Sequence, residues 1–366
     1  MAQGKIKIVY LGRYNNEVSN GPEKFSKQLF NNVVLENDAE FIEYFFKDYK
    51  ESNIIKRLFG KSIISVRPSV FRFGHITLLF YLLKTRPQIV HILTAERYTI
   101  PVLLYKFIIG SKIVTTFHCV LKFEIPNNSQ KRKELNRYRD YLWEWLALKF
   151  SDKTIFLTKS HLVLAEKYYK TDRNKISIIP NGVEKEFYNK EKEIKIDGPL
   201  KVVFYNGNND YIDRGLSEIL RVLKDLDFQM RLYIIGNKIN TKDAGLDIEF
   251  VNPMEKKSLR KFLVDKHVLL KSPSFDSFSI FSIECMAAGL IVVLSNKVGS
   301  SVYIKDGENG FVYDYNNSDR VKEILEDIFY NKYDLDKISS NAREILNTLN
   351  WENIAKQYLD CYKELI

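Results

Sequence analysis

The chain has 366 residues, of which 45% are hydrophobic and 28% are charged. This composition excludes a disordered chain, and the length predicts two domains, each with its own core. The net charge of +10 is uneven: residues 1–183 hold 30 Lys and Arg against 16 Asp and Glu, and residues 184–366 hold 26 against 30. The basic half favours an anionic partner. Charge alone does not decide whether this partner is nucleic acid, an acidic membrane or a phosphorylated substrate.

The three cysteines, Cys119, Cys285 and Cys361, lie far apart and form neither a disulfide framework nor a metal-binding motif. They favour a reducing compartment. The start MAQGKIKIVYLG leads directly into a strand pattern, so we expect no signal peptide. The longest apolar runs are well short of the roughly 20 residues of a membrane-spanning helix. We therefore expect a cytoplasmic protein that at most binds to the inner face of the plasma membrane.

Strand and helix patterns alternate along the first half. The strand pattern IKIVYLG is followed by PEKFSKQLFNNVVL, whose apolar residues at 25, 29, 30 and 33 have a helical spacing. Five more strand patterns follow: AEFIEYFF, QIVHILTA, KIVTTFHC, KTIFLTK and ISIIPNGV. Amphipathic stretches lie between them, at 75–84, 98–109, 136–150 and 160–169. This alternation predicts βαβ units and a parallel sheet.

A polar stretch at 184–199 is the best candidate for a linker, and the alternation restarts after it. The second half shows the strand patterns LKVVFYNG, QMRLYIIG, DIEFVNP, HVLLKSP and LIVVLSN. Its helical patterns lie at 216–226, 257–265, within the stretch 274–289, and at 318–330, 336–347 and 351–365. The chain therefore predicts two doubly wound α/β domains with a cleft between them.

The stretch SFDSFSIFSIECMAAG places Asp276 and Glu284 around the start of an apolar helix. Ligands of open parallel sheets bind beyond the carboxyl ends of the strands, and HVLLKSP is such a strand, so Asp276 is expected in the loop at that end. We expect the helix to begin near Ser277–Ser279, with a hydroxyl as its cap. Its N-terminus suits a diphosphate, with Glu284 on a ribose diol and Asp276 on sugar hydroxyls. The simpler alternative is that Asp276 caps the helix and Glu284 is a solvated helix residue.

The segment SPSFDSFSIFSIECMAAGLIVVLSN resembles the donor-binding segment of the retaining glycosyltransferases of family 4, which have the GT-B fold. The family pattern is Pro-Ser, an acid, Gly-Phe-Gly, then Glu-Ala-Met-Ala and Gly, with seven residues between the two acids. The matching residues are Pro273, Ser274, Asp276, Phe278, Glu284, Met286, Ala287 and Gly289. Five more segments also resemble the family, and all six stand in the family's order along the chain. The five are NGPEKFSKQL, TTFHCV and ISIIPNGVEKEFY before the donor segment, and KDGENGFVYD and WENIAKQYLDCY after it. The resemblance thus covers nearly the whole chain.

The resemblance implies an α/β protein of the GT-B fold, with two Rossmann-like, doubly wound parallel-sheet domains that face each other across a cleft. Residues 1–183 would form the acceptor-side domain and residues 184–350 the nucleotide-sugar donor domain. Residues 351–366 would form a closing helix that packs back on the first domain. Nothing in the sequence resembles an acidic Mg²⁺ site, so no metal and no cofactor are expected.

Site residues follow from the same resemblance. The expected catalytic residues are His118, Asp276 and Arg214, and the expected donor-binding residues are Gly21, Asn208, Arg214, Phe278, Ser279, Ile280 and Glu284. His118 would orient the donor sugar, while Arg214 and the helix N-terminus would hold the diphosphate. The residues alone leave simpler alternatives open. His118 could be an ordinary core or loop histidine, Gly21 a turn residue before a helix, and Arg214 a surface cation.

This chain departs from the family pattern at several of these positions. Ser277 and Ser279 replace the two glycines of the donor loop, and Asp276 replaces the usual Glu. Asn208 stands where the family has an Arg and Arg214 where it has a Lys. Val302 also falls where a Glu is common.

The implied activity is a retaining, metal-independent transfer of a sugar from a nucleotide-sugar, UDP favoured over GDP, to a glycan or lipid-linked acceptor in bacterial surface polysaccharide or glycolipid synthesis. The main alternative is a non-catalytic GT-B protein that binds a nucleotide-sugar or glycan, and a sugar-nucleotide epimerase is more remote. A nucleic-acid binder is suggested only by the basic half, which holds no recognised binding motif, so no nucleic acid is expected.

Two basic segments of the first half bear on the acceptor. Residues 54–67 mix apolar and basic side chains, and residues 131–150 place Leu135, Tyr138, Leu142, Trp145 and Leu146 on one helical stripe among basic residues. Such segments suit an anionic membrane surface. For either segment alone, a core helix with a solvated basic face is the alternative.

Overall fold

The computed structural model divides the chain into two compact units, which we call the first and second unit. The first unit comprises residues 1–126, 132–181 and 351–366, and the second comprises residues 127–131 and 182–350. The structure describes residues 5–14, 21–34, 37–44, 54–67, 69–126, 134–207, 215–236 and 245–366. Each unit is a parallel-sheet α/β domain, as the alternation of strand and helix patterns predicts.

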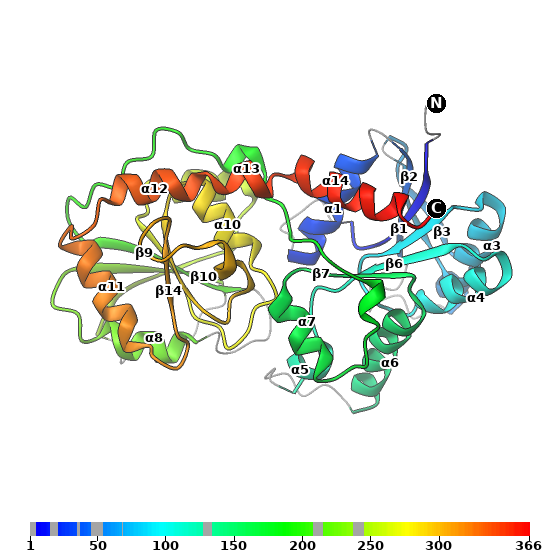
Figure 1. The fold of residues 1–366 in the computed structure, drawn as a ribbon, viewed down its shortest axis with the longest axis horizontal. Helices are drawn as coiled ribbons and strands as arrows, with labels where there is room; N and C mark the ends of the chain where they lie inside the picture. The colour runs from blue at the N-terminus through cyan, green and yellow to red at the C-terminus, as the bar shows by residue number, and fades with distance from the viewer. Residues whose placement is uncertain are drawn as a thin grey trace. The chain divides into compact units, whose positions relative to one another are not determined.

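The first unit contains a sheet and its covering helices (Figure 1). Its strands are β1 (Lys7–Gly12), β2 (Asp38–Tyr44), β3 (Lys61–Ser65), β4 (Val70–Phe73), β5 (Ile89–Ile92), β6 (Lys112–Thr116), β7 (Lys153–Phe156) and β8 (Ile176–Ile178). Its helices are α1 (Gly21–Val33), α2 (Ile54–Phe59), α3 (His75–Thr85), α4 (Thr99–Ile109), α5 (Leu121–Glu124), α6 (Glu134–Phe150), α7 (Lys159–Glu166) and α14 (Trp351–Lys363).

Within the described residues this sheet has eight strands in the order β3-β4-β2-β1-β5-β6-β7-β8. All neighbours are parallel except β3 and β4, which are antiparallel. The central strands β1, β5 and β6 are almost entirely buried because helices cover both faces of a parallel sheet. Helix α1 buries Phe25, Leu29, Phe30 and Val33 in this core, which confirms the helical spacing expected for them.

Helix α14 packs on α1 although more than 300 residues separate them in the chain, and the two ribbons lie side by side in Figure 1. A buried polar network fixes α14 to the sheet. The hydroxyl of Tyr362 lies 3.0 Å from that of Tyr10 and 2.6 Å from the Nδ1 of His91. The Nε2 of His91 lies 2.9 Å from the Oγ1 of Thr116, which lies 3.3 Å from the hydroxyl of Tyr358. The chain's last helix is therefore part of the first unit's core.

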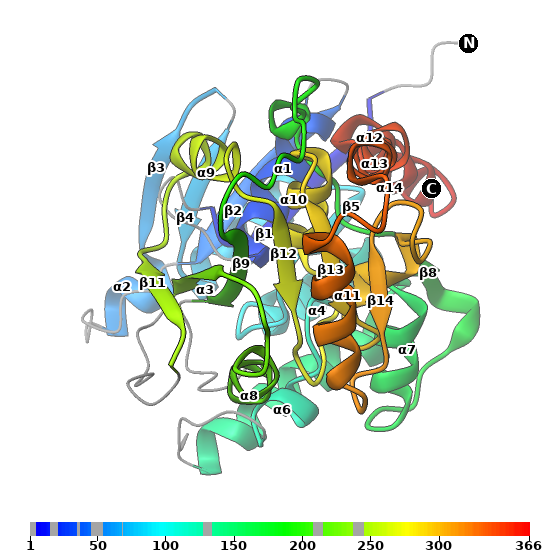
Figure 2. The same ribbon diagram turned by 90° about the vertical axis from the view of Figure 1, so that its left-hand side faces the viewer.

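The second unit repeats the architecture around a smaller sheet (Figure 2). Its strands are β9 (Leu200–Gly207), β10 (Met230–Gly236), β11 (Asp247–Val251), β12 (Val268–Lys271), β13 (Ile291–Ser295) and β14 (Phe311–Tyr313). Its helices are α8 (Leu216–Leu223), α9 (Lys256–Leu263), α10 (Ile280–Ala287), α11 (Asp319–Phe329), α12 (Leu335–Arg343) and α13 (Ile345–Leu349). In the described part, six parallel strands run in the order β11-β10-β9-β12-β13-β14.

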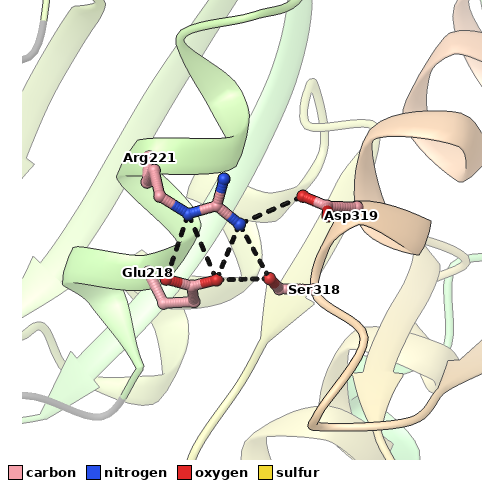
Figure 3. A network of polar contacts seen from close by, with 4 residues as sticks. All are labelled: Glu218, Arg221, Ser318 and Asp319. Atoms are coloured by element: carbon pink, nitrogen blue, oxygen red, sulfur yellow. Dashed lines mark hydrogen bonds and ion pairs between the residues drawn. The ribbon is translucent and has the colours of Figure 1, made fainter.

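Polar side chains join α8 and α11 on the surface of the second unit (Figure 3). The guanidinium of Arg221 donates to Glu218 at 2.8 Å, to Asp319 at 3.0 Å and to Ser318 at 3.3 Å. The hydrogen bonds from Arg221 and Ser318 lower the pKa of Glu218 to about 2. The three charged side chains are exposed, so the network orients the two helices and adds little to stability.

The structure differs from the sequence-based expectations in several places. It adds the strands β4 and β14, for which no strand pattern was identified. The basic segment 54–67 forms α2 and the edge strand β3. The prediction of a single helix at 336–347 was wrong, because the chain is divided at Glu344 into α12 and α13. No helix in the part of the chain that the structure describes is long and apolar enough to cross a membrane.

Candidate functional site

Strand β12 leads into helix α10 at the centre of the second sheet. The strand lies between β9 and β13, and the loop 272–279 follows its carboxyl end. The cap of α10 is Ser279, whose hydroxyl accepts a 3.4 Å hydrogen bond from the backbone N–H of Ser282 and lies 2.7 Å from that residue's hydroxyl. This confirms the helix start expected near Ser277–Ser279, and it rules out Asp276 as the cap.

Ser279 has an unusual backbone conformation, with φ of 70° and ψ of 83°. A side chain in this left-handed region costs roughly 1–2 kcal/mol relative to glycine. The family pattern has a glycine at this position, and the backbone geometry explains why. In this chain the serine keeps the conformation, and its hydroxyl makes contacts that a glycine lacks.

Lys271 is the functional candidate that the sequence analysis missed. It is the last residue of β12, and its side chain is only 3% exposed. Its ammonium donates to the Oδ2 of Asp276 at 2.6 Å and to the Oγ of Ser279 at 2.7 Å. A lysine in the otherwise apolar run HVLLK was the available signal, since lysine is rarely buried without a partner.

Asp276 is held on both sides of its carboxylate. Besides the ammonium of Lys271, it accepts a 3.1 Å hydrogen bond from the backbone N–H of Phe278 through Oδ1. Its backbone pairs with the chain after β13, because its N–H donates to Lys297 and its carbonyl accepts from Gly299 at 2.8 Å. The side chain is 17% exposed, so this fixed carboxylate still reaches solvent.

Glu284 lies in the middle of α10 and is 2% exposed. This burial excludes the alternative of a solvated helix residue. A carboxylate needs hydrogen-bond donors when it is removed from water, so an acid at this depth is a candidate for polar recognition rather than a surface charge.

The two remaining residues of the expected donor segment differ in orientation. Phe278 is buried and packs edge-on against the ring of Tyr303 at 6.2 Å, and its backbone N–H and carbonyl are bonded to Asp276 and Ser300. Ile280 is the first residue of α10 and is partly buried. The backbone around the helix start, rather than the Phe278 side chain, therefore carries the polar groups.

Asn208 and Arg214 lie outside the described residues. Gly215, which follows Arg214, caps α8 with φ of 87°. A β-carbon at Gly215 would lie 1.8 Å from the carbonyl oxygen of Ser272, so this backbone lies directly against the end of β12. The N-terminus of α8 and the N-terminus of α10 are thus at the same end of the second sheet.

His118 and Gly21 belong to the first unit. Gly21 is the exposed first residue of α1, and His118 follows β6. The imidazole of His118 packs edge-on against Phe25 of the same helix, with 4.6 Å between ring centroids. Burial, with a smaller effect of His161, lowers the pKa of His118 to about 3. The ring is therefore neutral at physiological pH and acts as a hydrogen-bonding group rather than a cation.

Across the described residues, the structure brings Asp276, Ser279 and Lys271 into direct contact. This cluster combines a helix N-terminus, a buried cation and a partly exposed carboxylate, and Glu284 lies one and a half turns along the same helix. A helix N-terminus with a nearby cation suits a phosphate group, and carboxylates suit hydroxyl groups. Among the residues described, no group of His, Cys, Asp or Glu is arranged to hold a metal ion.

Two family models match the chain, one in each half. A model described as Glycosyltransferase Family 4 matches residues 46–187, and one described as Glycosyl transferases group 1 matches residues 187–345. The second match includes β12, its loop and α10. Together the two matches run through both units.

Two curated relatives illustrate the sequence similarity. An uncharacterised glycosyltransferase of Methanocaldococcus jannaschii is 24% identical over 246 residues, which are 60% of this chain and 62% of the relative. The lipopolysaccharide 1,2-N-acetylglucosaminetransferase of Salmonella typhimurium is 23% identical over 211 residues, 50% of this chain and 55% of the relative. The chain spans 38% to 62% of the length of the first curated relatives it matches.

Solved structures share the fold over almost the whole chain. Sucrose-phosphate synthase from Thermosynechococcus elongatus has a TM-score of 0.77 at 16% identity, covering 98% of this chain and 99% of its own. Anabaena HepE in complex with UDP has a TM-score of 0.73 at 14% identity, covering 98% of this chain and 100% of its own. The chain therefore has the GT-B fold, as the sequence resemblance implies.

Proposed function

We propose that this chain, a member of the GT-B glycosyltransferases by its fold and by both family models, transfers a sugar from a nucleoside diphosphate sugar to a glycan or lipid-linked acceptor. The observation that carries this proposal is the start of α10. There Ser279 caps the helix at the carboxyl end of the central strand β12, with Asp276 before it and the buried Glu284 within it.

Each group has a role that its chemistry supports. The N–H groups at the start of α10, together with Arg214, would bind the diphosphate, because a helix N-terminus favours anions. Glu284 would accept hydrogen bonds from the ribose diol, and Asp276 from hydroxyls of the sugar. His118 and Gly21 remain predicted contacts of the donor sugar, with His118 as a neutral hydrogen-bonding group.

The reaction breaks the bond between the anomeric carbon and the diphosphate and forms a bond from that carbon to an acceptor oxygen. Charge develops on the departing diphosphate, and preorganised N–H donors and cations stabilise such charge most strongly. We propose that the protein supplies this charge without a metal or other cofactor, and that the anomeric configuration is retained.

We propose UDP as the nucleotide. The support is that HepE, which shares the fold, has been crystallised with UDP and with UDP-glucose. The acceptor proposal, a glycan or lipid-linked acceptor in surface polysaccharide or glycolipid synthesis, draws on the Salmonella lipopolysaccharide transferase among the relatives.

The test is donor turnover by the purified chain. UDP-glucose, UDP-galactose, UDP-N-acetylglucosamine and GDP-mannose are incubated with the protein, nucleotide release is measured, and the anomeric proton of any product is assigned by NMR. We expect release of UDP from one UDP-sugar, slow with water as acceptor and lost in Glu284→Gln. If the protein binds UDP but releases no more nucleotide from any donor than a protein-free control does, the result would favour the non-catalytic alternative.

We further propose that the first unit binds an anionic membrane surface at the cytoplasmic face, where a lipid-linked acceptor is found. Helix α2 has no buried residue, and large apolar side chains are exposed along residues 54–67. They are Ile54, Ile55, Phe59, Ile63, Ile64 and Val66, with exposures between 37% and 71%. The same segment contains Lys56, Arg57, Lys61 and Arg67 and no acidic residue.

Helix α6 also supports binding to an anionic membrane surface. Tyr138, Leu142 and Trp145 of its expected apolar stripe are exposed, while Leu146 of the same stripe packs against the core with Phe150. Three residues of the stripe are therefore available at the surface although the helix also contributes to the core. Exposed apolar residues among basic ones match the chemistry of an anionic lipid surface, where both area and charge contribute to binding.

Vesicle sedimentation tests this part of the proposal. We expect the protein to pellet with vesicles that contain phosphatidylglycerol and to remain in the supernatant with pure phosphatidylcholine. The double variant Ile55→Ser/Phe59→Ser should lose binding, and Val264→Ser, which changes an exposed apolar residue of the second unit, should not. Equal sedimentation of all three proteins with phosphatidylglycerol would contradict the proposed surface.

A further inference from the structure

Lys271 is a buried cation whose ammonium lies at the start of a helix. Its side chain is 3% exposed, and removing an ammonium from water is costly unless it is paired. Its ammonium bonds to Ser279, the cap of α10, so it lies at the positive end of that helix. A cation there is disfavoured by the helix dipole. The carboxylate of Asp276 offsets the cost of burial, and an anionic ligand at the same place would offset the unfavourable interaction with the dipole.

The bonding of Lys271 shows where such an anion would act. The ammonium is shared between the Oδ2 of Asp276 at 2.6 Å and the Oγ of Ser279 at 2.7 Å, and it lies 5.8 Å from the ring centroid of Tyr205 on β9. Asp276 is the partly exposed member of the pair, and its Oδ1 is fixed by the N–H of Phe278. At the start of α10, the carboxylate of Asp276 therefore lies between the buried ammonium of Lys271 and the solvent.

We propose that Lys271 is the cation that draws the donor's diphosphate to the N-terminus of α10, and that Asp276 is its counter-ion when no donor is bound. This inference rests on the proposed function. It also gives a physical role to a departure in the sequence: Asn208 stands where the family has a phosphate-binding Arg, and Lys271 returns one positive charge from the neighbouring strand. A buried charge is weakly screened, so its field reaches a ligand without direct contact.

A second buried lysine of the same region provides a matched control. Lys266 lies just before β12, at the opposite end of the strand, and its ammonium pairs with Asp265. That ammonium also lies over the rings of Tyr233 and Phe262, 4.3 Å and 4.4 Å from their centroids. Lys266→Met therefore removes a buried, carboxylate-paired lysine without changing the charge at the start of α10.

The experiment measures UDP dissociation constants by calorimetry for the wild type, Lys271→Met, Asp276→Asn, the double variant Lys271→Met/Asp276→Asn and Lys266→Met. Removing the cation should weaken UDP binding by about tenfold, the loss typical of one charge-assisted contact. Removing the counter-ion should tighten UDP binding by about threefold while reducing sugar transfer. If the two effects are independent, the double variant should bind UDP about threefold more weakly than the wild type. Lys266→Met should bind it as the wild type does.

The order of the affinities separates a charge effect from a structural one. A purely structural ion pair predicts weaker UDP binding in Asp276→Asn and Lys271→Met alike, and that result overturns the inference. If Lys271→Met does not fold, the Asp276→Asn arm decides, since it retains the lysine. A wild type that binds UDP with the same affinity as all its variants overturns the role of Lys271 alone. A wild type that binds no nucleotide overturns the proposed function as well.

Discussion

Gly215 lies so close to Ser272 that a β-carbon on the glycine would stand 1.8 Å from the serine's carbonyl oxygen. This contact joins the start of α8 to the end of β12, the strand that carries Lys271. It also fixes the residue that follows Arg214 at the end of the sheet where α10 begins.

Gly215→Ala should therefore destabilise the second unit strongly. Alanine adds a backbone overlap, typically worth about 1–3 kcal/mol, to the cost of φ at 87°. Gly307→Ala is the matched control, because Gly307 has φ of 75° but nothing within 4 Å of its β-carbon position. Urea unfolding should show a loss about 2 kcal/mol larger for Gly215→Ala. Equal losses would mean that the contact with Ser272 is loose.

The backbone of Ser279 makes a second, opposite prediction about glycine. Ser279→Gly removes the hydroxyl but relieves φ of 70°, while Ser279→Ala removes the hydroxyl and keeps the strain. We expect Ser279→Ala to be less stable than Ser279→Gly by about 1 kcal/mol in urea unfolding. At an ordinary helix position the order is reversed, so an alanine variant as stable as the glycine variant would argue against the left-handed conformation.

The network around Tyr362 should be stabilising. Tyr362→Phe leaves the buried Nδ1 of His91 and hydroxyl of Tyr10 without this partner, which typically costs 1–3 kcal/mol, here about 2 kcal/mol. Tyr358→Phe removes only the 3.3 Å contact with Thr116 and should cost about 0.5 kcal/mol. Thermal unfolding compares the two, and similar losses would show that His91 does not depend on Tyr362.

Buried histidines should make the protein less stable in mild acid. Burial, with neighbouring cations adding to it, lowers the pKa of His75 and His267 to about 4, and that of His118 to about 3. Unfolded histidine titrates near 6.5. Below that pH the unfolded chain binds protons that the folded chain does not, so the free energy of unfolding falls as pH falls from about 6.5 towards 4.

One acid opposes this trend. Burial raises the pKa of Glu144 to about 8, so its protonated form stabilises the folded state as pH falls through 8. Since more histidines act in the other direction, we expect a lower urea midpoint at pH 5.5 than at pH 7.5. Glu144→Gln should steepen the fall and His118→Gln should reduce it. An unchanged midpoint in Glu144→Gln, where the opposing acid is absent, would mean that these histidines are charged in the folded protein.

The sequence alone predicts the strand, the loop and the helix that form the candidate site. The apolar run HVLLK, the helix after it and the cap near Ser279 follow from residue spacing and capping preferences. The ion pair of Lys271 with Asp276 does not follow, because it depends on how the loop 272–278 folds back over the strand. The strain at Ser279 also requires the backbone angles, although the glycine of the family pattern hints at it.

Segment 54–67 shows the other limit of sequence reasoning. Its mixed basic and apolar pattern indicates a surface-binding segment but not the edge strand β3, which pairs with the next strand β4 and joins the sheet through the pairing of β4 with β2. The break at Glu344 is similar, since the apolar spacing continues across it while the helix does not. Tertiary contacts decide both cases.

The most direct test of the central claim is a thermal-shift titration of the wild type, Glu284→Gln and Glu323→Gln with UDP and GDP. A nucleotide at about a hundred times its dissociation constant stabilises the folded state by roughly 2.7 kcal/mol, which raises Tm by several degrees. We expect UDP to raise the Tm of the wild type and of Glu323→Gln, whose changed residue is an exposed acid of α11, and to leave that of Glu284→Gln unchanged. A folded wild type that neither nucleotide stabilises, or an equal shift in Glu284→Gln, would contradict a nucleotide-sugar site at the start of α10.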